Sequence, residues 1–213
     1  IVLLIGLVGL YLSVPAALRT FEIPALQTLA ADGQIPQLSW VYGCLLIGFG
    51  ILISLFPFHT WAPQAYASAP APAAMLHAGV LKKFGLYGLM RVALPLLPEA
   101  AQGWTTLLLI LLTGNILYVG LATIAQKKLD WMLGYSSVMH MGYIFLGLAS
   151  LNVVGLSGAS LLIFAHGLSV AALFAIAGEI RQRTKTLDYA QLSGLGKPLP
   201  FLSYTFGLAA FAS

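Results

Sequence analysis

Two adjacent lysines, Lys82 and Lys83, lie near the middle of an apolar run, residues 72–97, that otherwise has the composition of a membrane-spanning helix. A charged side chain at mid-bilayer costs about 3 kcal/mol on insertion scales, and such residues usually mark ion or proton pathways. Burial disfavours the charged form of an amine, so a dry lysine can exchange protons near neutral pH. We therefore predict proton transfer at one or both lysines. The alternatives are a structural ion pair with an acid, or snorkelling.

The geometry of a continuous helix limits what the two lysines can do together. Consecutive residues are about 100° apart, so at most one lysine is expected to face a given partner. Lys83 would then share its helix face with Gly79 and Tyr87, four residues to either side. Gly85 and Gly88 leave the helix thin and are expected to allow close packing by a neighbouring helix.

A polar stripe is predicted in the segment GYSSVMHMGY. His140 has Ser136 and Ser137 one turn before it and Tyr143 one turn after it. Residues at these spacings share a helix face, and histidine titrates near neutrality, so the stripe is suited to carry protons. His166 lies in the next apolar run. A lone histidine in such a run is usually a hydrogen-bonded core residue, but two on consecutive spans beside a lysine make a relay an equal alternative.

Four further polar or kinked positions accompany these residues. Ser169 follows His166 by one turn. Pro57 should break the second span, because proline lacks a donor and clashes one turn back. Broken helices expose carbonyls that transporters use for ions, so His59 is predicted to gate entry from the cytoplasmic side; a simple helix exit is the alternative. Glu179, near the end of a span, is available to pair with a lysine.

Composition makes this chain an integral membrane protein. Of its 213 residues, 60% are hydrophobic and 8% are charged, against about 25% charged in a soluble domain. The single cysteine, Cys44, excludes a disulfide framework and a cysteine-based metal site. Nucleic acid is not an expected partner. The chain lacks a start methionine, and both ends lie within apolar stretches, so we expect it to be a fragment of a longer polytopic protein.

Seven helical spans are predicted, since a span needs about 20 apolar residues and only helices satisfy the backbone in runs of this kind. The predicted spans are 1–14, 39–57, 72–97, 103–125, 131–150, 155–178 and 199–213. One set of loops then carries a single base, Arg19. The other set carries Lys127, Lys128, Arg181, Arg183, Lys185 and Lys197. By the positive-inside rule, the second set is expected to face the cytoplasm or its organelle equivalent.

Three segments together resemble one protein family: FPFHTWAPQAYASAPAPAAMLHAGVLKKFGLYGLMR, GYSSVMHMGY and AHGLSVAALFAIAGEIRQRTKT. They are similar to the antiporter-like membrane subunits of complex I, the proton-pumping NADH:quinone oxidoreductase. The similarity covers essentially the whole chain and is strongest to the M-type subunit, while the Pro-Ala-Pro of the first segment is also similar to the N-type. Related subunits occur in Mrp-type sodium/proton antiporters and in membrane-bound hydrogenases.

This resemblance implies an all-α, inverted-repeat helix bundle. Residues 1–97 would form the end of the first repeat and residues 98–213 the start of the second. Lys83, or its neighbour Lys82, would be the central lysine of the family's eighth helix, and His140 and His166 would lie on the central hydrophilic axis. The chain itself would hold no redox cofactor and no metal. NADH, FMN, iron–sulfur clusters and quinone would be bound by partner subunits, and the L-type and N-type chains would be its neighbours in a bacterial inner membrane or organelle equivalent.

Departures from the family pattern keep two other functions open. The position of the family's principal lysine on the seventh helix is Leu52 here, and the usual acids and histidine of the following loop are missing from residues 63–70. The predicted function is proton translocation within a complex I-like oxidoreductase. The alternatives are a subunit of a cation/proton antiporter or hydrogenase without this redox arm, and a non-conducting scaffold, for which Leu52 is the main support.

Overall fold

The computed structural model describes residues 1–212, which form helices joined by loops, with no β-strand among them. The predicted all-α class is confirmed. The helices form two compact units, which are described separately below. The predicted repeat boundary at Pro98 concerns internal symmetry rather than packing, and it stays a prediction.

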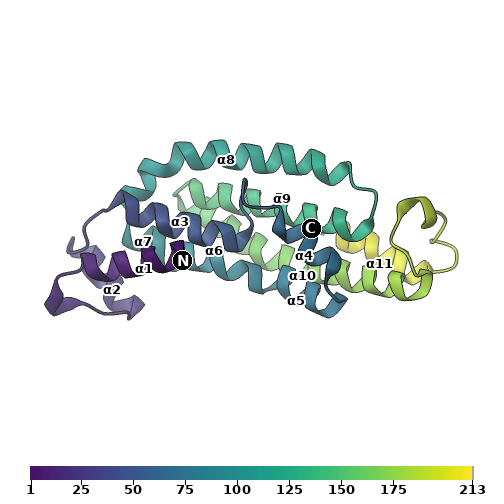
Figure 1. Ribbon diagram of the computed structural model, residues 1–213, viewed down its shortest axis with the longest axis horizontal. Helices are drawn as coiled ribbons and strands as arrows, with labels where there is room; N and C mark the ends of the chain where they lie inside the picture. The colour runs from purple at the N-terminus through teal and green to yellow at the C-terminus, as the bar shows by residue number, and fades with distance from the viewer. Residues whose placement is uncertain (213) are drawn as a thin grey trace. The chain divides into compact units, whose positions relative to one another are not determined.

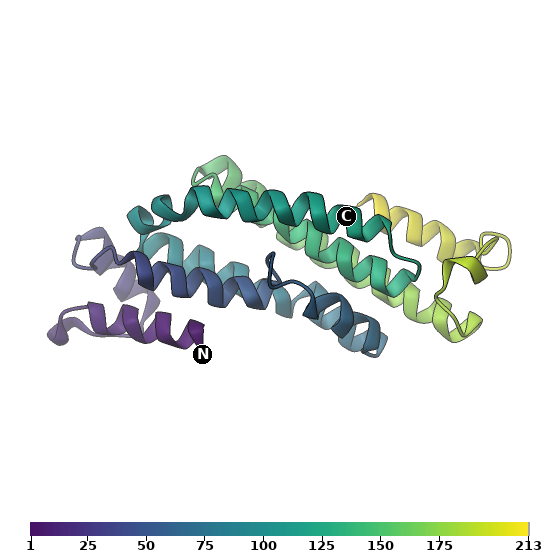
Figure 2. The same ribbon diagram turned by 45° about the horizontal axis from the view of Figure 1, so that its top comes forward.

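The first unit comprises residues 1–53 and 84–110. Helix α1 packs along α3, and α3 packs against α6 and the π-helical turn η3 (Figure 2). Its elements are α1 (Val2–Ser13), η1 (Ala16–Leu18), α2 (Ile23–Ala31), α3 (Ser39–Ile53), α6 (Phe84–Gly88), η3 (Leu89–Ala93), α7 (Leu94–Leu96) and the first part of α8 (Pro98–Ile124).

The second unit comprises residues 54–83 and 111–213. Helix α10 lies at its centre and packs against α9, α5 and α11, while α4 packs against α9 (Figure 1). Its elements are α4 (Trp61–Ser68), α5 (Ala71–Gly79), the 3-10 turn η2 (Leu81–Lys83), the rest of α8, α9 (Leu129–Ala149), α10 (Val153–Thr184), η4 (Tyr189–Gln191) and α11 (Pro200–Phe211).

Each of the seven predicted spans contains helix. Among the residues described, α8, α9 and α10 are long and apolar enough to cross a membrane, and α1, α3 and α11 are shorter apolar helices. The break predicted near Pro57 is confirmed: α3 ends at Ile53, four residues before the proline, and α4 begins only at Trp61. The ring of a proline clashes with the carbonyl four residues earlier, which explains this end point.

The third predicted span, 72–97, is not one continuous helix, so that part of the prediction was wrong. Helix α5 ends at Gly79; Val80 leaves the helical region with φ −127° and ψ −62°, and a 3-10 turn follows before α6. A 3-10 turn rotates the chain further per residue than an α-helix, which changes the face that each side chain occupies. Consequently Lys83 is buried whereas Tyr87 is 58% exposed, and the predicted shared face does not exist.

The predicted close packing at Gly85 and Gly88 is confirmed within the first unit. A Cβ atom added at Gly85 would lie 2.6 Å from Cγ1 of Ile53 and 2.9 Å from the backbone oxygen of Phe49. At Gly88 it would lie 2.4 Å from the Phe49 ring. Glycine at both positions lets α6 and η3 approach α3 directly, as small residues do at helix interfaces in membranes.

We predict that Gly85→Ala destabilises the protein, because the added methyl group meets a backbone atom that cannot move aside. Overpacking of this kind costs about 1–3 kcal/mol. The control is Gly103→Ala in α8, where an added Cβ has nothing within 4 Å and the gain in helix propensity is about 0.5–1 kcal/mol. Thermal unfolding of the detergent-purified full-length subunit should show a lower midpoint for Gly85→Ala alone. Equal midpoints for the two variants would contradict this account of α6 packing.

Candidate proton-transfer site

Both lysines are buried at the helix break of the second unit. Lys82 is 0% exposed and Lys83 is 6% exposed. A helix end leaves carbonyl groups without intrahelical partners, and a cation near that end is stabilised by them. Lys83 Nζ donates to the carbonyl oxygen of Ala78 in the last turn of α5. Lys82 Nζ donates to the carbonyl oxygen of Ser137 on α9, at 3.4 Å. The break thus supplies the partner of Lys83, whereas Lys82 bonds a carbonyl inside the continuous helix α9, which accepts a second hydrogen bond.

No carboxylate pairs with either lysine among the residues described, where the ion pairs are Arg181 with Asp130 and Arg183 with Glu179. The prediction that Glu179 is available to a lysine was therefore wrong. It accepts a 2.6 Å hydrogen bond from Arg183, one turn on in the same helix. The Glu179 carboxylate stays in contact with water when it pairs with Arg183, because both side chains are partly exposed. Pairing with Lys82 or Lys83 would require burying that carboxylate at the helix break.

Close approach of α5 to α10 puts the lysines beside His166. Gly79 and Gly167 face each other: an added Cβ on Gly167 would lie 2.8 Å from the carbonyl oxygen of Gly79, and 3.9 Å from Cε of Lys83. Any larger residue would separate the helices. His166, which is buried, directly precedes Gly167. The two glycines therefore set the distance between His166 and the turn that carries the lysines.

The two predicted relay histidines lie against each other. The rings of His140 on α9 and His166 on α10 are stacked, with centroids 4.8 Å apart and an interplanar angle of 14°. Imidazole N–H bonds lie in the ring plane, so in parallel stacked rings neither nitrogen points at the other ring. The structure brings the pair together as the sequence indicated, but in a geometry that does not allow a direct N–H···N bond between them.

The predicted stripe of serines is divided between the two histidines. His140 Nδ1 lies 2.8 Å from the carbonyl oxygen of Ser136. Because a carbonyl only accepts, Nδ1 carries the hydrogen and Nε2 is the bare nitrogen of the neutral ring. The Ser137 hydroxyl turns instead to the other helix, 3.4 Å from His166 Nε2. Tyr143 is 43% exposed, and its ring meets His140 at a centroid distance of 6.1 Å.

Ser137 is the junction of the site. Its carbonyl oxygen accepts from Lys82 Nζ and its hydroxyl contacts His166 Nε2. It is fully buried. The hydroxyl can donate and accept at once, but the Lys82 amine lies on the Ser137 carbonyl. A proton therefore reaches the hydroxyl only when the amine turns towards it or a water bridges the two groups. Ser169, a supporting candidate one turn after His166, donates to the backbone carbonyl of His166 at 3.3 Å.

A second branch was not predicted. The Lys82 Nζ atom lies 5.7 Å from the ring centroid of the buried Tyr66, a cation–π distance. The Tyr66 hydroxyl lies 3.3 Å from His77 Nδ1, and the rings of Trp61 and His77 meet nearly at right angles with their centroids 5.6 Å apart. Tyr66 and His77 come from α4 and α5, on opposite sides of the Pro70 turn, so no helical spacing in the sequence indicates that they meet.

Asn115 is a further buried residue that sequence reasoning missed. Its Nδ2 donates to the Val138 carbonyl at 3.0 Å and its Oδ1 accepts from the Phe56 backbone amide at 3.2 Å. Asn115 thereby ties the non-helical segment after α3 to the helix that carries the histidines. The signal was present: a lone amide in the middle of an apolar span is rarely without a structural or functional role.

His59 lies in that non-helical segment, as predicted, but it is 4% exposed and enclosed by aromatic rings. Its ring lies 5.5 Å from that of Phe56 and 6.0 Å from that of Tyr118, between centroids. Its Nδ1 atom has no hydrogen-bond partner among the residues described. Within residues 1–212, no group of three His, Cys, Asp or Glu side chains is placed to bind a metal.

Comparison with known proteins gives a consistent assignment. The family model described as NADH:quinone oxidoreductase/Mrp antiporter, TM, matches residues 1–213. The chain is 44% identical over 194 residues to NAD(P)H-quinone oxidoreductase chain 4-2 of Synechocystis sp., covering 91% of this chain and 34% of that protein. It is 39% identical over 213 residues to NAD(P)H-quinone oxidoreductase chain 4 3 of Picosynechococcus sp., covering 100% of this chain and 38% of that one. The chain thus spans little more than a third of these relatives.

Solved structures share the fold. A chain of respiratory complex I from Thermus thermophilus with bound NADH superposes with a TM-score of 0.85 at 30% identity, covering 96% of this chain and 43% of that chain. A chain of the Mrp complex from Dietzia sp. reaches 0.85 at 24% identity, covering 99% and 38%, and this likeness concerns the fold alone. With its apolar helices, the chain is an integral membrane protein. It belongs to the NADH:quinone oxidoreductase/Mrp antiporter transmembrane family, and its sequence relatives are chain 4, the M-type antiporter-like subunit of complex I.

Proposed function

We propose that this chain is part of a proton-translocating membrane subunit of a complex I-like NAD(P)H:quinone oxidoreductase. The observation that carries the proposal is the buried contact series from Lys82 through Ser137 to His166. Two dry amines next to each other repel when both are charged, so the site favours giving up one proton to a neighbouring base. The relatives named above support the enzyme class, since each is a chain of a NAD(P)H-quinone oxidoreductase.

In the proposed mechanism, Lys82 or Lys83 exchanges a proton with water on one side of the membrane. The Lys82 amine then turns from the Ser137 carbonyl to the Ser137 hydroxyl, or a water bridges them, and the hydroxyl gives its proton to His166 Nε2 as it accepts the proton of the lysine. Transfer onward between His166 and His140 requires a ring rotation or a bridging water, because the rings are stacked. Rotation of one imidazole would form or break the hydrogen-bonded connection between the two histidines, so proton transfer can be switched on or off at this step.

The driving force would come from other subunits. NADH, FMN, iron–sulfur clusters and quinone are proposed to be bound by partners, and L-type and N-type chains to flank this one in the membrane arm. Charge changes in those neighbours would move protons on and off the lysines. The orientation proposed from the basic loops places Lys127, Lys128 and Arg181 on the cytoplasmic side.

A cation/proton antiporter subunit is the second candidate, because the family model covers both kinds of complex. The purified complex discriminates between them: flavin and iron–sulfur subunits co-purify in the first case, and only antiporter subunits in the second. A non-conducting scaffold is favoured by Leu52, which is 38% exposed and apolar where the family has a lysine.

We predict that Lys82→Ala/Lys83→Ala abolishes proton movement through this subunit without preventing assembly. Loss of a positioned proton-transfer group costs about a hundredfold in rate or more. The measurement is the number of protons translocated per quinone reduced, in liposomes containing the purified complex. Lys197→Ala, at an exposed loop position, is the matched control and should behave as the unmodified protein. An unchanged ratio in the double variant would rule out the lysine mechanism.

Ser137→Ala should slow proton movement, because it deletes the hydroxyl that contacts His166 Nε2; the expected loss is about a hundredfold. Ser160→Ala is a control of the same chemistry. The exposed Ser160 hydroxyl donates to the Leu156 carbonyl of its own helix at 2.8 Å, so its loss should have little effect. The same proton-to-quinone ratio reports both variants, and equal effects would show that Ser137 is not the junction.

A further inference from the structure

The ring of Tyr66 on α4 lies beside the buried amine of Lys82. The Lys82 Nζ atom is 5.7 Å from the centroid of the ring, within the roughly 6 Å at which the negative face of an aromatic ring attracts a cation. The two residues are 3% and 0% exposed, respectively. Because both groups are removed from water, this attraction is stronger than it would be at the surface.

The other contacts of Lys82 do not compensate its charge. Its amine donates to the Ser137 carbonyl at 3.4 Å, which is long for a hydrogen bond to an uncharged acceptor. Lys83 bonds the carbonyl of Ala78, and no aromatic ring lies under its amine among the cation–π contacts described. Within the part of the chain that the structure describes, the ring face therefore distinguishes Lys82 from Lys83.

Tyr66 is held in place from two other helices. Its hydroxyl lies 3.3 Å from His77 Nδ1 on α5. Its ring packs against that of Phe174 on α10, with centroids 5.4 Å apart and an interplanar angle of 55°. A phenol that donates a hydrogen bond becomes more electron-rich, because hydrogen-bonded groups polarise one another. The ring that Lys82 approaches is thus fixed by residues other than the lysines.

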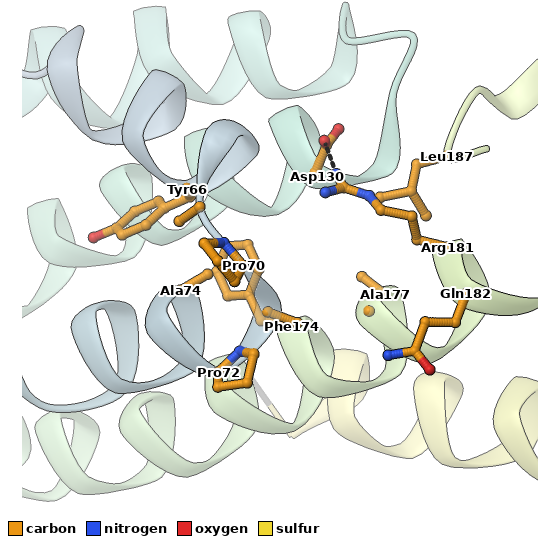
Figure 3. Close-up of a pocket in the computed structure, with 13 residues that line it drawn as sticks. Tyr66, Pro70, Pro72, Ala74, Asp130, Phe174, Ala177, Arg181, Gln182 and Leu187 are labelled. Carbon is orange, nitrogen blue, oxygen red and sulfur yellow. Dashed lines mark hydrogen bonds and ion pairs between the residues drawn. The ribbon is translucent and has the colours of Figure 1, made fainter. Parts of the chain in front are cut away.

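The cavity beside Tyr66 supplies no counter-ion for the amine. Tyr66 lines a cavity of about 270 Å³ that is open at the exposed Gln182, and its hydroxyl points away from Asp130 and Arg181 (Figure 3). These two charged lining residues pair with each other. The charge of Lys82 is therefore compensated at this place by the ring face and not by the ions of the cavity.

We propose that Tyr66 is a positioning residue for Lys82: the face of its ring takes the place of a counter-ion and holds the charged amine beside Ser137. The proposal rests on the proton-translocating function proposed above. A carboxylate would bind the ammonium group through directed hydrogen bonds. A ring face attracts the charge without fixing any one N–H bond, so the amine can turn from the Ser137 carbonyl to the Ser137 hydroxyl while it stays over the ring.

The test changes the charge on the ring face and keeps its size. Tyr66→Phe is compared with phenylalanines that carry increasing numbers of ring fluorines at position 66, since each fluorine withdraws electrons from the face. At mildly acidic pH, which keeps the amine charged, the thermal midpoint of the detergent-purified full-length subunit should fall stepwise, by a total of about 2 °C. With Lys82→Met the fall should be absent, and the comparison of the two backgrounds isolates the contact.

Fluorinated phenylalanine at position 145 is the matched control. Phe145 is 1% exposed on α9, and no cation lies over its ring among the contacts described. The effect of fluorine there should be the same with Lys82 and with Lys82→Met. In liposomes containing the purified complex, Tyr66→Phe should retain most of the proton movement, whereas Tyr66→Leu, which has no ring, should slow it about tenfold.

A midpoint series at position 66 that is the same in both Lys82 backgrounds overturns the proposal. So does unchanged proton movement in Tyr66→Leu, because the ring would then stabilise the amine without positioning it. The midpoint measurements need no pumping. Failure of the proposed function would appear instead in the Lys82→Ala/Lys83→Ala variant, so the two failures are distinguishable.

Discussion

The placement of two amines at a broken helix is the constraint on which the rest of this structure depends. An amine held away from water needs acceptors, and the carbonyls at a helix end have no intrahelical partner. The break after Gly79 frees the end of α5, and Lys83 donates to the carbonyl of Ala78 there. Lys82 reaches across to α9 for a second carbonyl, that of Ser137. Neither partner carries charge, so the site solvates the lysines without neutralising them.

Several features of the second unit follow from that constraint. Gly79 and Gly167 let α5 lie directly on α10, which brings His166 next to the lysine-bearing turn. Asn115 fixes the segment after α3 to α9 by bonding at both ends of its amide group. These contacts involve small or uncharged groups, which hold a polar centre rigid without adding a counter-ion.

The stacked histidines prevent the site from forming one continuous chain of hydrogen bonds. A chain of hydrogen bonds conducts only when every donor points at an acceptor, and the parallel rings of His140 and His166 interrupt the chain at one place. The same fold occurs in respiratory complex I and in an Mrp complex. Because one fold serves several functions, the function has to be argued from such local geometry. In this chain, the hydroxyl of Ser137 and the orientation of two imidazoles carry that argument.

The sequence alone determined the class of protein, the positions of the apolar spans and the break near Pro57, and it singled out the lysines and histidines that the structure brings together. These depend on composition, on proline chemistry and on charges in apolar runs, all of which are local. Only the tertiary structure decided that the helix breaks at Val80, because glycine permits a break there without requiring it. It also decided that Ser137 faces His166 while Ser136 holds His140, and that Tyr66 meets His77 and Lys82. Those contacts are between different helices. Residue spacing along the chain shows which side chains share a face of one helix, but it does not show which other helix packs against that face.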